Sequence, residues 1–166
     1  VVLLVASLYY PAAAVATKSN FFNGDPNLDG LDFVRRRSGA EYEAIEFIRA
    51  NATADSAILE AVGEWFDAGL ISRSTGVPTV LNWPGHQLQW RGSDDVFAGR
   101  EQDVERIYET EDPLEARNLL AKYSLDYVYV GPRERSKHGN VNLMKFEDLL
   151  EKVFHKDNVA IYKVRK

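Results

Sequence analysis

The chain has 166 residues, 45% of them hydrophobic and 27% charged, which suits one domain with one core and excludes a disordered tail or low-complexity linker. Its 20 Lys and Arg against 25 Asp and Glu leave a net charge of −5, which argues against a nucleic-acid partner bound through phosphate neutralisation. There is no cysteine, so disulfide scaffolds, cysteine zinc sites, iron–sulfur clusters and thiol catalysis are excluded.

The first segment, residues 1–17, contains no charged side chain. At a rise of ~1.5 Å per residue, a helix of this stretch would be roughly 25 Å long, just short of a bilayer core. Tyr9, Tyr10 and Lys18 stand where a membrane exit would place interfacial residues. Three interpretations stay open: the end of a transmembrane or anchoring segment, the remnant of a signal peptide, and an ordinary buried helix or strand. Pro11 disfavours one uninterrupted helix in water, because proline lacks a backbone donor and crowds the preceding turn.

Residues 18–40 are rich in Asn, Asp and Gly and are predicted to form a connecting loop. Within it, Arg35–Arg37 are interpreted as a solvated charge run, with contact to lipid phosphates as the alternative. The rest of the chain, 41–166, is predicted to be a soluble α/β domain. A capping box that begins at Ser38 starts its first helix, and this helix continues to about Asn51.

Helices and strands then alternate along the domain. We expect strands at 57–63, 77–81 and 127–130, a loop at 82–93, helices at 67–74, 95–109 and from 112 onward, and a C-terminal hairpin at 153–164. This order predicts an α/β sandwich of two or three layers around a small mixed sheet, with parallel strands and a C-terminal antiparallel hairpin. The arrangement is Rossmann-like without a nucleotide motif, since neither GxGxxG nor GxxxxGK[ST] occurs.

The predicted loop at 82–93 holds the densest group of chemically distinctive side chains. Flat indole faces stack on sugar rings, while imidazole, amide and guanidinium groups supply directed hydrogen bonds. The alternative is a long Ω-type loop that anchors itself by burying its own Trp side chains. Both interpretations stay open, and the candidate ligand-binding residues of this segment are Trp83, His86, Gln89, Trp90 and Arg91.

Glu60 is a second candidate, because it interrupts an apolar strand near its carboxyl end, where open α/β sheets place their ligands. A buried carboxylate needs a partner, and Arg73 or Arg91 would supply one in a structural interpretation. If Glu60 is instead desolvated beside His86, general acid–base chemistry is open to it. Arg135, after the last central strand, is a candidate for binding an anion or for reaching Glu60, with a solvated turn as the alternative.

No metal, cofactor or catalytic residue is assigned from the sequence. His86, His138 and His155 lie far apart, and none has metal-ligand spacing. The motifs GxSxG and HExxH do not occur. Since no second carboxylate stands in the 82–93 segment, a glycosidase-type pair is not visible either.

Five blocks between residues 58 and 135 carry a resemblance to a known family. They are Ile58–Gly63, Ile71–Leu81, Trp83–Gly92, Asp103–Tyr108 and Tyr127–Arg135. Together they resemble the YYY membrane proteins, which are uncharacterised polytopic proteins distantly similar to glycosyltransferases of the GT-C class, enzymes that use lipid-linked sugar donors. Gln87 stands where that family has Glu, which puts a catalytic carboxylate at this position in doubt.

The resemblance implies an extracytoplasmic C-terminal domain of a glycosyltransferase-like protein in the cell membrane, attached through the N-terminal segment. GT-C enzymes carry their catalytic acidic residues between early transmembrane helices. The resemblance therefore implies a non-catalytic accessory role for this chain, with a lipid-linked sugar or other glycan as the partner. Two alternatives stay open: a stand-alone hydrolase that uses Glu60 and His86, and an interaction module that docks through the acidic face at 94–115.

Overall fold

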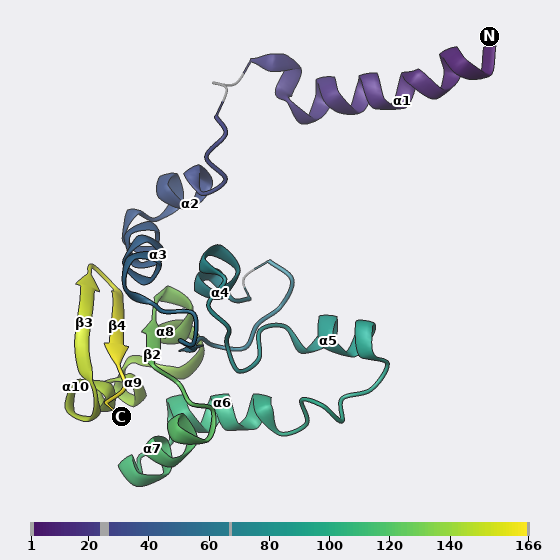
Figure 1. The fold of residues 1–166 in the computed structure, drawn as a ribbon. Coiled ribbons are helices and arrows are strands. Elements are labelled where there is room, and N and C mark those ends of the chain that lie inside the picture. The colour runs from purple at the N-terminus through teal and green to yellow at the C-terminus, as the bar shows by residue number, and fades with distance from the viewer. Residues whose placement is uncertain (1, 24–26, 67, 166) are drawn as a thin grey trace. The chain divides into compact units, whose positions relative to one another are not determined.

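The computed structural model describes three stretches of the chain, residues 2–23, 27–66 and 68–165 (Figure 1). The chain divides into two compact units, Val1–Phe33 and Val34–Lys166. Two parts of the sequence predictions fall outside the described residues, namely 24–26 in the expected loop and Asp67 at the expected start of a helix.

The first unit contains helix α1 (Val2–Lys18) and one turn of 3-10 helix, η1 (Asn20–Phe22). Pro11 lies inside α1, so the expected interruption at this residue is wrong. The helix gives up the one backbone hydrogen bond that proline cannot donate and continues on both sides of it. In the part of the chain that the structure describes, no helix is both long enough and apolar enough to cross a membrane.

The second unit is built on a four-stranded sheet with the order β1-β2-β4-β3. The strands are β1 (Ile58–Leu59), β2 (Tyr127–Val130), β3 (Glu151–Lys156) and β4 (Val159–Lys163). β1 pairs parallel with β2, while β4 pairs antiparallel with both β2 and β3. This confirms the predicted mixed sheet with a parallel pair and a C-terminal antiparallel hairpin.

Helices precede β1 and connect β1 to β2 and β2 to β3. They are α2 (Asp32–Arg37), α3 (Gly39–Asn51), α4 (Leu70–Thr75), α5 (Pro84–Arg91), α6 (Arg100–Glu109), α7 (Pro113–Lys122), α8 (Pro132–His138), α9 (Asn140–Leu143) and α10 (Lys145–Leu149). Two of them begin at the predicted caps. The Ser38 hydroxyl accepts the Glu41 N–H at 3.3 Å, and the Asp112 carboxylate accepts the Leu114 N–H at 2.9 Å.

Four expected elements differ from the structure. The strand expected at 57–63 is only two residues long, β1 (Ile58–Leu59). Residues 77–81 do not form a strand, and only Thr79 makes an isolated bridge, because Pro78 has no N–H for a ladder. The expected loop at 82–93 contains helix α5. Arg35–Arg37 form the last turn of α2 rather than part of a loop, in a position where basic side chains favour the negative end of the helix dipole.

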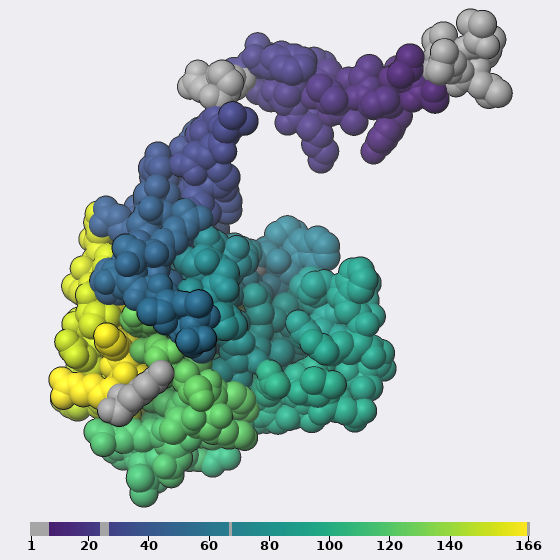
Figure 2. All heavy atoms as spheres, viewed as in Figure 1, coloured from purple at the N-terminus to yellow at the C-terminus, as the bar shows by residue number. Residues whose placement is uncertain are grey.

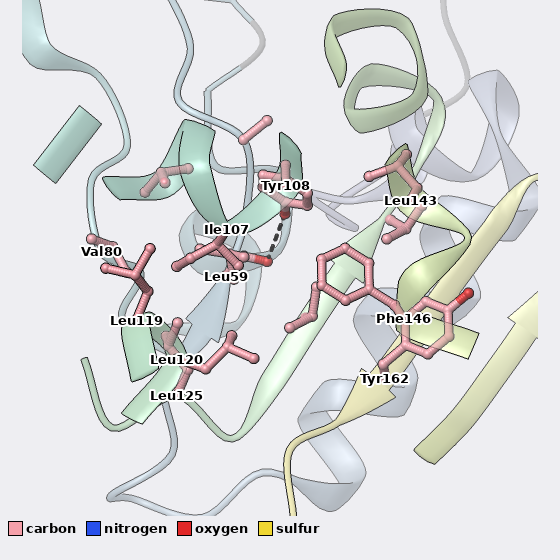
Figure 3. Packing of buried hydrophobic residues seen from close by; sticks show 14 of the residues in the cluster. Leu59, Val80, Ile107, Tyr108, Leu119, Leu120, Leu125, Leu143, Phe146 and Tyr162 are labelled. Carbon is pink, nitrogen blue, oxygen red and sulfur yellow. Dashed lines mark hydrogen bonds between the residues drawn. The ribbon is translucent and has the colours of Figure 1, made fainter. Parts of the chain in front are cut away.

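The sheet is covered on both faces, which makes three layers. Val128 and Val130 of β2 belong to the core cluster that includes residues of α6, α7 and α10. Figure 3 shows Ile107, Leu120 and Phe146 of this cluster. Tyr127 points to the opposite face, where α3 packs, and its hydroxyl donates to the Asn51 carbonyl at 3.2 Å. Because both faces are covered, all four residues of β2 are buried. The core includes Leu59, Val104, Ile107, Leu120, Phe146 and Tyr162.

We expect Gly131→Ala to destabilise the fold by about 1–3 kcal/mol, the usual cost of overpacking. A Cβ at this position would lie 2.2 Å from the Tyr129 hydroxyl oxygen, and both residues are buried. Urea unfolding measures the loss. Gly39→Ala is the matched control, since nothing lies within 4 Å of its added Cβ. Equal stability of the two variants would contradict this packing.

Candidate functional site

Helix α5 carries most of the residues that the sequence singled out. Pro84 occupies its first turn, and Gly92 ends it in the left-handed conformation, with φ 75° and its N–H bonded to the Leu88 carbonyl. Proline at the start and glycine just past the end are ordinary helix boundaries. That signal was present in the sequence, but the density of aromatic and amide side chains led to the prediction of a loop.

The helix gathers the candidate side chains into one cluster, which we name the aromatic surface: Trp65, Trp83, His86, Gln89 and Trp90. The His86 ring stacks on Trp83, with ring centroids 5.1 Å apart and an interplanar angle of 15°. Trp90 also meets His86, edge-on, with ring centroids 5.9 Å apart. Trp83, His86 and Trp90 share a helical face because they lie three and four residues apart. The structure thus brings together four of the five candidates predicted from this segment, while Arg91 lines a different hollow.

Trp65 completes the surface and was missed by the sequence analysis. It lies in the stretch between β1 and α4, and its ring meets Trp83 edge-on at 5.1 Å. The available signal was the adjacent pair Trp65-Phe66 in a segment without regular periodicity, where large aromatic side chains are unusual. The sequence offered no means of placing this pair beside α5, since about twenty residues separate them.

The aromatic surface is open to solvent. Trp65 is 66% exposed and Trp90 is 77% exposed, so the alternative of a loop that buries its own Trp side chains is wrong for Trp90. The five side chains enclose a hollow of about 430 Å³, within the range of roughly 300–1,000 Å³ typical of small-ligand sites. Figure 2 shows α5, in teal, at the outer surface of this unit.

Glu60 is buried, as the sequence predicted, but its partners are not arginine side chains. Its two carboxylate oxygens accept the backbone N–H groups of Ile71 and Ser72 at 2.7 and 2.8 Å, at the first turn of α4. Burial raises the pKa of the Glu60 carboxyl, against the lowering effect of these two hydrogen bonds and of the Arg73 charge. The carboxylate therefore caps α4, and in the described residues it forms no salt bridge with Arg73 or Arg91, the partners that the structural interpretation named.

Glu60 and His86 belong to different hollows. His86 lines the aromatic surface, whereas Glu60 lines a small cavity of about 70 Å³ together with Tyr129, Arg133 and Glu134. Direct proton transfer between Glu60 and His86 is not available in this arrangement. The geometry does not support the predicted acid–base pair.

Glu134 is a second buried carboxylate that the sequence analysis missed. It accepts the Ala61 N–H at 3.0 Å and the Gly131 N–H at 2.9 Å, and so joins the start of α8 to the end of β1. Burial raises the pKa of its carboxyl to about 7. Its place three residues after Gly131 is the reciprocal position of a capping box, which is the signal that was available.

The remaining candidate residues are arginines in two places. Arg135 donates hydrogen bonds to the Asn158 carbonyl at 2.8 Å and to the Asn140 side chain at 3.1 Å, and so links α8 to the β3–β4 turn. These bonds do not include the expected contact with Glu60. Arg73 and Arg91 both line a hollow beside α4 and α5. In the described stretches of the chain, no group of three or more His, Asp or Glu side chains has an arrangement that could hold a metal ion.

No protein-family model, curated protein or solved structure matches this chain.

We expect the contribution of Glu134 to the stability of the fold to fall as pH rises from about 4.5 to about 7. The folded state holds the Glu134 proton more tightly than the unfolded chain does, because its pKa is about 7 rather than 4.5. This contribution is therefore fully present below pH 4.5 and is lost as pH rises through 7, up to about 3 kcal/mol. Glu134→Gln stays neutral throughout and should lose less stability between pH 5 and pH 7.5.

Urea unfolding at these two pH values measures the difference. The control is Glu46→Gln, because Glu46 is exposed and its replacement should leave the wild-type pH dependence unchanged. A drop in Glu134→Gln as large as that of the wild type would contradict the assignment.

Proposed function

We propose that this chain is a non-catalytic glycan-binding domain and that the aromatic surface is its binding face. The observation that carries the proposal is the convergence of all three Trp side chains of the protein around one open hollow. Exposed indole rings cost free energy in water unless a ligand covers them. A ligand with flat apolar faces and polar edges gains most from such a surface.

Sugars have this chemistry. Their C–H faces pack on indole rings, and their hydroxyl groups exchange hydrogen bonds with imidazole and amide side chains. His86 and Gln89 supply these groups in the same hollow as Trp65 and Trp90. The described residues that line the hollow include no Asp, Glu, Lys or Arg, which suits an uncharged part of a ligand.

In this proposal the domain serves an extracytoplasmic, glycosyltransferase-like membrane protein. It holds a lipid-linked sugar or other glycan for a catalytic centre elsewhere in that protein, and the N-terminal segment attaches it to the membrane. The resemblance of the sequence to the YYY membrane proteins supports this part of the proposal. So does the exposure of Leu8, Tyr9 and Tyr10 on α1, which are 59%, 77% and 78% accessible.

The two alternative functions have less support. The hydrolase hypothesis needs Glu60 and His86 in one site, and they line separate hollows. The docking hypothesis needs free acidic side chains at 94–115. Several of these acids are used within the fold: Asp103 pairs with Lys122, Glu109 with His138, and Glu115 with Arg106.

Titration of the ¹⁵N-labelled protein with neutral hexose and N-acetylhexosamine oligosaccharides tests the proposal. We expect saturable shifts of the Trp65, Trp83 and Trp90 indole N–H resonances. Trp90→Ala should weaken binding about tenfold or more, because it removes the most exposed of the stacking rings. Leu88→Ala is the control, since Leu88 is on α5 and 49% exposed but does not line the hollow. If no sugar shifts any indole resonance, the proposal fails.

Trp65→Ala gives a separate test of the residue that only the structure assigns to the site. We expect sugar binding to weaken about fivefold or more, because one wall of the hollow is lost. The midpoint of thermal unfolding should change little, since Trp65 is 66% exposed. Calorimetric titration and a thermal melt measure the two quantities. Unchanged affinity would remove Trp65 from the binding face.

A further inference from the structure

A second hollow, of about 420 Å³, lies between α4, α5 and the start of α6. The chain leaves α5 at Gly92 and returns through residues 93–99 to α6, as Figure 1 shows. Three arginines line this hollow, one from each helix: Arg73, Arg91 and Arg100. We name it the arginine hollow. Its other lining residues include Ser72, Thr79, Asn82, Gln87, Val96 and Phe97.

The described lining of the arginine hollow supplies no negative charge to balance its arginines. Among the described residues that line it there is no Asp or Glu. None of the three arginines forms a salt bridge with a carboxylate in the described stretches of the chain. Arg73 also borders the cavity of Glu60, whose carboxyl pKa its charge lowers, but the oxygens of Glu60 bond to backbone N–H groups. A concentration of positive charge is unusual on a chain with a net charge of −5.

Each of the three arginine side chains uses only one of its nitrogen atoms in hydrogen bonds that the structure gives within the protein. Arg91 donates from Nε to the Gln87 side-chain oxygen at 2.9 Å, one helical turn earlier. Arg100 donates from Nη1 to the Val80 carbonyl at 3.3 Å. Arg73 makes long bonds of 3.4 Å from Nη1 to two carbonyls between β1 and α4. A guanidinium has five N–H donors, so several donors of each side chain remain for a ligand.

We propose that the arginine hollow binds a phosphate group. Guanidinium forks match the paired oxygens of phosphate and carboxylate alike. The number of cations favours phosphate over carboxylate. Three arginines carry more positive charge than a single carboxylate neutralises, and they suit a phosphate monoester of charge near −2. The Asn82 side chain borders the hollow and adds a polar group for the substituent that the phosphate carries.

This site is distinct from the aromatic surface. Arg91 and Gln87 lie on the neighbouring face of α5 from Trp83 and Trp90, by the 3.6-residue period of the helix. The described lining residues of the two hollows do not overlap. The proposal therefore stands without glycan binding, and a phosphate probe that contains no sugar tests it separately.

The experiment titrates the ¹⁵N-labelled protein with inorganic phosphate at low ionic strength, with chloride at matched ionic strength as the reference. We expect saturable shifts of backbone resonances at Ser72, Thr79, Asn82 and Gln87, and little change at the indole resonances of the aromatic surface. Arg91→Gln should weaken phosphate binding about tenfold. Its side chain is exposed and its one bond is to Gln87, so the variant should fold.

Arg117→Gln is the matched control, because Arg117 is an exposed arginine of α7 that does not line the hollow. Its affinity for phosphate should stay within about twofold of the wild type. A second variant, Arg73→Gln, should weaken binding by a similar factor to Arg91→Gln. Equal losses in Arg117→Gln and Arg91→Gln, shifts that chloride reproduces, or shifts that do not saturate would each overturn the proposal.

Discussion

Two buried glutamates hold the structure together where its parallel strands end. Glu60 follows β1 and accepts hydrogen bonds from two backbone N–H groups of α4. Glu134, in the first turn of α8, accepts a hydrogen bond from the N–H of Ala61. Buried backbone donors must be paired. Glu60 pairs donors in the first turn of α4, and Glu134 pairs the Ala61 N–H just beyond the two-residue strand β1. Together they join β1 and α4 to α8, which directly follows β2.

This arrangement affects where function is found. Open α/β sheets ordinarily bind ligands at the carboxyl ends of their parallel strands. Here that position holds a cavity of only about 70 Å³, and the carboxylates in it are engaged with backbone. The two larger hollows beside α5 lie further along the connection between the parallel strands. The β1–β2 connection thus supplies both proposed sites, while the sheet supplies rigidity.

Helix α5 divides the two kinds of chemistry between neighbouring faces. Its aromatic and imidazole side chains form a surface without charge, and Arg91 points to a hollow with two further arginines. Small residues make this division sterically feasible. Gly85 lies under the Trp83 indole, where an added Cβ would come within 3.0 Å of Nε1. Gly92 then ends the helix with a positive φ, a conformation that costs glycine little.

The sequence alone determined the features that depend on local spacing. Ser38 and Asp112 were predicted as helix caps, the alternation at 127–130 as a strand, and the C-terminal hairpin from its turn. These succeed because capping and strand periodicity involve residues only a few positions apart. Four of the five side chains of the aromatic surface were named for the same reason, since they belong to one short segment.

Only the tertiary structure decided which distant residues meet. Trp65 joins Trp83, Glu134 bonds the backbone of Ala61, and Arg100 joins Arg91 around one hollow, and in each pair the two residues come from different elements. It also separated Glu60 from His86, which the sequence analysis had considered as one acid–base pair. The physical reason is that packing and the pairing of buried donors are set by the whole core, whereas a linear pattern records only neighbours along the chain.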